Sequence, residues 1–129
     1  MGRLKQELLD RVEHYADRVL DVADTLESLG KPARIISQVS GSGTSVGANA
    51  FEADEAMSAK DFIKCLGIVM KELNETRFWL RRCESRGWIA ASRLQPVLNE
   101  TAELRAIFGS MIVRTRAKVG VPRSPDGLC

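Results

Sequence analysis

A glycine-rich stretch is the part of the sequence whose residue types come nearest to a catalytic motif. Residues 43–47 read Gly-Thr-Ser-Val-Gly, which is the G-x-S-x-G string of a hydrolase nucleophile elbow. That chemistry requires a strand before the serine and a histidine after it in the chain. The single histidine, His14, precedes the motif, and no strand pattern is present. The sequence therefore argues against a serine hydrolase.

The same stretch does not fit a phosphate-binding loop either. A Walker loop ends in Gly-Lys-Ser/Thr, and a dinucleotide fingerprint has a different glycine spacing and a preceding strand. Each glycine costs about 1 kcal/mol in a helix relative to alanine. Small residues on a buried face nevertheless let two helices approach closely, and the apolar residues keep a helical period through the glycines. We predict a helix over residues 33–56, with Ser42 or Gly43 at the contact position and these residues on the buried face: Ile35, Val39, Val46, Ala50, Ala53.

Four polar residues are expected to approach the interior of the fold, namely Asn49, Glu52, Glu72 and Glu75. Carboxylates inside a helical bundle are typical of di-iron proteins, which use Glu-x-x-His motifs on two helices. The sequence contains no such motif, so we expect no metal, no cofactor, no small-molecule substrate and no enzymatic activity. A hydrogen-bond network that fixes helix register and a solvated face remain the two alternatives. Trp79 is expected to pack within or between subunits.

Basic residues gather near the ends of two expected helices. The net charge is only +2, but residues 1–64 hold 8 basic and 11 acidic side chains whereas residues 65–129 hold 11 and 6. Basic side chains at helix C-termini complement the helix dipole, and a nucleic-acid contact is the alternative. The first cluster is Arg77, Arg81, Arg82 and Arg86, and the second is Arg114, Arg116, Lys118 and Arg123.

Apolar residues at spacings of three and four predict three further helices. The first has the stripe Leu8, Val12, Tyr15, Val19, Val22, Leu26 and Leu29, and ends at Gly30. The third is capped by Ser58 and carries Phe62, Leu66, Val69, Leu73, Thr76 and Leu80. The fourth is expected to begin near Ser92 with Gln95 completing a capping box, and its stripe is Leu94, Val97/Leu98, Thr101, Leu104, Phe108, Met111, Thr115 and Val119. Short connections between such helices predict an all-α, antiparallel up-and-down four-helix bundle over residues 1–120, followed by a flexible tail over residues 121–129.

The cysteines and the hydropathy indicate a cellular location. Cys65, Cys83 and Cys129 are an odd set without a paired short spacing, so we expect free thiols, which suit a reducing compartment. The N-terminal residues lack an apolar signal region, and no apolar run is long enough to span a bilayer. The expected location is the cytoplasm, without a membrane partner.

One block of sequence resembles a known family. The residues Ser42-Gly-Thr-Ser-Val-Gly-Ala-Asn49 with Glu52, followed by Lys60-Asp-Phe-Ile63, Glu72, Glu75 and Trp79, resemble the proteins encoded in intervening sequences of bacterial 23S rRNA genes. The resemblance covers residues 5–118 and implies a left-handed up-and-down bundle that assembles as a homopentamer. The family is distantly similar to the accessory variability proteins of diversity-generating retroelements, which bind nucleic acid and a reverse transcriptase. The residues that match the family pattern are Ser42, Gly43, Ser45, Gly47, Asn49, Glu52, Glu72, Glu75 and Trp79.

Two functions are compatible with these patterns. The first is a non-enzymatic scaffold that assembles into a ring, in which the acidic first helix of one copy meets the basic half of the next. The second is an accessory protein that binds structured RNA through the arginine clusters, with oligomerisation multiplying a weak basic patch.

Overall fold

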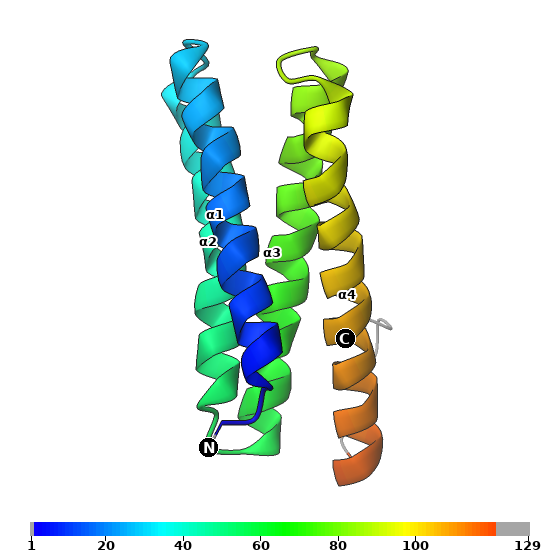
Figure 1. Cartoon of the computed structure of the whole chain (residues 1–129). Helices are drawn as coiled ribbons and strands as arrows, with labels where there is room; N and C mark the ends of the chain where they lie inside the picture. Colours follow the sequence, from blue (N-terminus) through cyan, green and yellow to red (C-terminus); the bar gives the residue numbers. More distant parts are fainter. Residues whose placement is uncertain (1, 121–129) are drawn as a thin grey trace.

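The computed structural model describes residues 2–120, which form four helices. They are α1 (Gln6–Ser28), α2 (Ala33–Asp54), α3 (Ala59–Ser85) and α4 (Ala91–Val119). The helices run alternately up and down (Figure 1), and each packs on two neighbours, while the pairs α1 with α3 and α2 with α4 are not in contact. This arrangement confirms the predicted antiparallel four-helix bundle. The predicted tail, residues 121–129, lies outside the described residues.

The two ends of the bundle differ in what they carry. We call the end with the α1–α2 and α3–α4 connections the top, and the end with the N-terminal segment and the α2–α3 connection the base (Figure 1). The α1–α4 pair and the α2–α3 pair form opposite sides of the bundle, because α1 and α3 occupy diagonal corners. A side chain exposed in the α1–α4 seam and one exposed in the α2–α3 seam can therefore lie at the same level along the bundle axis and still face opposite directions.

Local sequence explains where most of the helices begin and end. Ser58 caps α3, since its hydroxyl accepts a hydrogen bond from the Asp61 backbone N–H at 3.1 Å, as predicted. Gly30 and Gly87 take φ angles of 71° and 68° just beyond α1 and α3, a region that glycine adopts without steric cost. The predicted capping box of Ser92 is wrong. Helix α4 begins one residue earlier, and its N-cap Ala90 makes no side-chain hydrogen bond.

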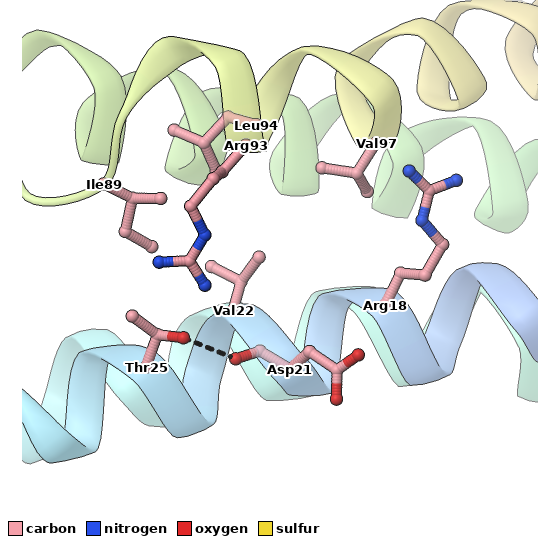
Figure 2. Close-up of a pocket in the computed structure, with 8 residues that line it drawn as sticks. All are labelled: Arg18, Asp21, Val22, Thr25, Ile89, Arg93, Leu94 and Val97. Atoms are coloured by element: carbon pink, nitrogen blue, oxygen red, sulfur yellow. Dashed lines mark hydrogen bonds between the residues drawn. The ribbon is translucent and has the colours of Figure 1, made fainter.

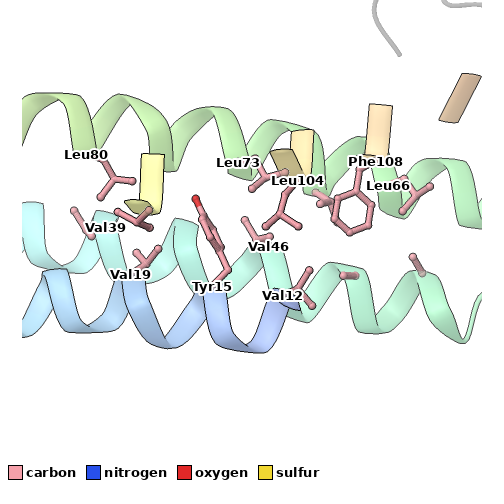
Figure 3. Packing of buried hydrophobic residues seen from close by; sticks show 14 of the residues in the cluster. Val12, Tyr15, Val19, Val39, Val46, Leu66, Leu73, Leu80, Leu104 and Phe108 are labelled. Carbon is pink, nitrogen blue, oxygen red and sulfur yellow. The ribbon is translucent and has the colours of Figure 1, made fainter. Parts of the chain in front are cut away.

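The core fills the space between the four helices, and Figure 3 shows its layers around Tyr15, Leu73 and Leu104. Most of the predicted stripe residues are buried, two are exposed, and the half-buried ones are Leu8, Val22, Ile35, Leu98, Met111 and Thr115. Leu29 is 49% exposed because it follows the last residue of α1. On α4, Ile112 rather than Met111 is fully buried, and Val119 is exposed. A period of 3.6 residues drifts away from a heptad pattern over a long helix, so the buried face of α4 moves from position 111 to position 112.

The N-terminal segment is fastened across the base. The backbone N–H groups of Arg3 and Leu4 donate to the Asp54 carbonyl and carboxylate at 3.0 and 2.7 Å. The Arg3 guanidinium donates from Nε to the Ala56 carbonyl at 2.8 Å and lies 5.5 Å from the centre of the Phe62 ring. Leu4 is buried as a result. Among residues 2–120, no helix is long and apolar enough to cross a membrane.

Candidate interaction surfaces

The glycine-rich stretch lies inside α2, which runs through Gly41, Gly43 and Gly47 without a break. Ser45 is a half-buried helical residue, so the stretch forms neither a nucleophile elbow nor a phosphate loop. A β-carbon on Gly43 would overlap the Val19 side chain, whereas one on Gly41 would meet nothing within 4 Å. The predicted close approach of two helices is therefore found at Gly43, where α2 packs on α1.

The predicted polar residues lie along the seam between α2 and α3. Asn49 donates from Nδ2 to the carbonyl and the hydroxyl of Ser45, at 2.9 and 3.0 Å. The Trp79 indole N–H donates to Glu75 at 3.4 Å. Burial raises the pKa of Glu72; repulsion from Glu75 raises it further, and the Ser45 hydroxyl partly offsets the shift. These groups are half-buried and lie at the margin of the interior.

Glu52 departs from the expectation, since it is exposed near the base. Nothing among residues 2–120 gathers three or more histidine, cysteine or carboxylate side chains in a way that could hold a metal ion. The polar residues of the seam between α2 and α3 therefore form hydrogen bonds within their own helices, between residues four apart. Across the seam, Glu72 of α3 lies next to Ser45 of α2.

The two predicted basic clusters do not meet within one copy. Arg81, Arg82 and Arg86 are exposed at the top, whereas Arg114 and Lys118 are exposed at the base. Helix α4 has 29 residues, so the clusters are separated by roughly 40 Å at 1.5 Å per residue. The remaining two members are less available. Arg77 is half-buried and donates to Asn74 at 2.6 Å, and the Nε of the half-buried Arg116 is buried without a hydrogen-bond partner. Arg123 lies outside the described residues.

The exposed faces of α1 and α3 carry opposite charge. On α1 the outward residues are acidic, and on α3 one exposed face is basic, with the exposed Phe78 between Lys71 and Arg81. Arg82 stacks on Phe78 at 5.3 Å from the ring centre. Because α1 and α3 are diagonal, these faces point in opposite directions. The acidic face consists of Asp10, Glu13, Asp17, Asp21 and Asp24, and the basic face of Lys60, Lys64, Lys71, Arg81 and Arg82.

The seam between α1 and α4 contains the feature that sequence reasoning missed. Arg11 forms a two-pronged ion pair with Glu100, at 2.6 and 3.0 Å, and the Tyr15 hydroxyl bonds to Thr101 Oγ1 at 2.7 Å in the core. Burial raises the pKa of Tyr15 to about 12. Arg11 lies at the helical spacing of the α1 stripe next to Leu8 and Tyr15, which was a signal that it faces a neighbouring helix. Its partner on α4 could not be chosen from the sequence.

Hollows open above and below these polar contacts, since α1 and α4 are the least closely packed neighbours. Figure 2 shows the upper one, about 150 Å³, where Arg18 and Arg93 reach across the seam from α1 and α4 beside Asp21. We call it the mixed hollow because it contains both signs of charge. The lower one, at the base, has a volume of about 500 Å³.

These features define a small helical bundle whose distinctive surfaces, within residues 2–120, are charged faces and shallow hollows between helices. Residues 5–110 match the family described as 23S rRNA-intervening sequence protein, and the chain belongs to that family. A solved structure with the same fold is that of a protein with unknown function from the S23 ribosomal protein family of Bacteroides thetaiotaomicron. It is 33% identical with a TM-score of 0.77, and the match covers 81% of this chain and 96% of that one. No curated protein matches the chain.

Proposed function

We propose that this protein is a non-enzymatic interaction protein that assembles with further copies of itself. The observation that carries the proposal is the opposite charge of the two diagonal faces, acidic on α1 and basic on α3. A surface that complements a different surface of the same molecule favours a head-to-tail contact, which closes into a ring when the rotation between copies allows it. The resemblance stated above implies five copies. We place this function in the cytoplasm, since the described cysteines, Cys65 and Cys83, are free thiols and free thiols suit a reducing compartment.

Sedimentation velocity tests the proposal directly. At tens of micromolar protein (roughly the range in which weak interfaces fill) and low salt, we expect a species several times the 14.3 kDa chain mass. Association should weaken between about 0.05 and about 0.5 M salt, because exposed charges are screened over a few ångströms at high ionic strength. A monomer under the low-salt condition would contradict the proposal.

Binding of structured RNA is a second candidate, and one observation favours it. The basic face of α3 extends over residues 60–82, roughly 33 Å at 1.5 Å per residue, and includes the exposed Phe78 beside Arg82. A line of cations along one helix face can contact a phosphate backbone, and an exposed ring can stack on an unpaired base.

Fluorescence anisotropy with a labelled RNA hairpin across a salt series tests this candidate. Replacing Lys64 and Lys71 by alanine should weaken binding and reduce its salt dependence. The matched control replaces Arg34 and Lys118 by alanine, since both are exposed and lie on α2 and α4, away from the basic face of α3. No binding at low salt, or equal losses in both double variants, would count against a site on α3.

A further inference from the structure

Two hollows at the base carry opposite charge. The first lies between α1 and α4 and is lined by four basic side chains with one acidic side chain. Its floor is apolar and includes Leu4, Leu8 and Met111. We call it the basic hollow, and its charged residues are Arg3, Lys5, Arg11, Arg114 and Glu7.

The second hollow lies between the end of α2 and the beginning of α3 and has a volume of about 410 Å³. Its carboxylates are Glu52, Glu55 and Asp61, all exposed, and among the described residues that line it Lys64 alone is basic. Ala56 and Ile68 provide an apolar floor. We call it the acidic hollow.

The two hollows lie at the same height and are lined by different pairs of helices. They adjoin at the base, where the Arg3 side chain of the basic hollow donates to the Ala56 carbonyl of the acidic hollow at 2.8 Å. Both are at the base, one in the α1–α4 side and the other in the α2–α3 side. The connection that borders the acidic hollow also carries Met57, which is 93% exposed.

We propose that the acidic hollow of one copy docks on the basic hollow of the next, with both bundles pointing the same way. This inference rests on the proposed self-association and adds, beside the contact between the α1 and α3 faces, a second contact at the base and the direction of the copies. The occupant of each hollow is a second copy because the two surfaces complement each other in charge and both have apolar floors. Turning the second copy upside down would bring the acidic hollow against the mixed hollow, where Arg18 and Arg93 are accompanied by Asp21. Rotational symmetry of a ring requires the parallel direction.

Charge reversal at each hollow tests the contact. In the full chain, Glu52→Lys/Glu55→Lys makes the acidic hollow basic, and Lys5→Glu/Arg114→Glu makes the basic hollow acidic. Each double variant alone should associate about tenfold more weakly or worse, because like charges then face each other. An equimolar mixture of the two should associate again, since one variant then has two basic hollows and the other two acidic ones. A ring of five cannot alternate two variants throughout, so the expected result is oligomers that contain both variants, whether or not they reach the wild-type size.

Matched controls reverse the same amount of charge at the top of the bundle, with Glu27→Lys/Glu84→Lys and Arg34→Glu/Arg86→Glu. Circular dichroism melting shows whether each variant is folded, and the mixing experiment keeps the test valid if one variant loses some stability. A monomeric wild type would end both the proposed function and this inference. A wild-type oligomer that tolerates both base variants, responds equally to the controls, or is not restored by mixing would overturn the inference and leave self-association standing.

Discussion

Helix α1 packs on its two neighbours in contrasting ways. Toward α2 the contact is close because Gly43 presents no side chain to Val19. Toward α4 the contact is wider and is made by long polar side chains, Arg11 with Glu100 and Tyr15 with Thr101, with hollows on either side. A close seam leaves no room for a ligand or a partner, whereas a wide seam retains surface that another molecule can fill. The wide seam therefore leaves open surface on the α1–α4 side, where the mixed hollow and the basic hollow lie.

Replacing Gly43 by a larger residue should lower the free energy of unfolding more than any change in the α1–α4 seam. Gly43→Leu inserts a side chain where Val19 already lies, and overpacking of this kind costs about 3 kcal/mol. Gly41→Leu is the matched control, since Gly41 is exposed with free space around it, and leucine is favoured over glycine in a helix by roughly 0.8 kcal/mol. Urea unfolding should therefore show a large loss for the first variant and a small gain for the second. Similar losses in both would mean that the α1–α2 contact is not close at Gly43.

Breaking the buried hydroxyl pair should have the next largest effect. Thr101→Val leaves the Tyr15 hydroxyl buried without this partner and should cost about 2 kcal/mol. Tyr15→Phe should cost only about 1 kcal/mol, since the Thr101 hydroxyl keeps its bond to the Val97 carbonyl at 2.8 Å. The double variant should lose less than the sum of the two in chemical denaturation. Strictly additive losses would show that the hydroxyl groups do not interact.

Alkaline pH should loosen the same contact. The pKa of Tyr15 is raised to about 12 by burial, so between pH 10 and pH 12 the unfolded chain loses this proton while the folded chain keeps it. The contribution of Tyr15 to stability is therefore complete below pH 10 and falls by about 1.4 kcal/mol per pH unit above it. Comparing wild type with Tyr15→Phe by denaturation across this range isolates the contribution, because other groups titrate in both. Parallel pH profiles would contradict a buried neutral Tyr15.

Removing the Arg11–Glu100 ion pair at the exposed edge of the α1–α4 seam should have the smallest effect on stability. Arg11 is 38% exposed and Glu100 is 17% exposed, so Arg11→Met should cost only about 0.5–1 kcal/mol at low salt and less at high salt. Arg18→Met is the control, because Arg18 lies in the same seam and, among the residues described, ion pairs are found only at Arg11. Thermal melting at two salt concentrations measures both. A salt-independent loss at Arg11 would indicate that its aliphatic stem, rather than its charge, stabilises the seam.

The sequence by itself determined the four helices and most of their ends, and it narrowed the close contact to Ser42 or Gly43. Periodicity carries this information because one buried stripe per helix repeats every 3.6 residues. Gly30 ends a helix and Ser58 begins one through their own backbone or side-chain chemistry. Helix α4 was the least well predicted element. Its long stripe drifts in phase, so Ile112 is buried where Met111 was predicted. Ser92, predicted as its N-cap, lies inside the helix.

Only the tertiary structure decided which faces meet. Charge signs along α1 and α3 were readable from the sequence, but their diagonal placement depends on how four helices close around one core. The same holds for the pairing of Arg11 with Glu100 and for the two hollows at the base. Their residues lie far apart in the chain, from Arg3 to Thr115, and no local rule brings them together. Packing of the shared core sets the distance and register between the helices, and thereby determines which surface remains open to a partner.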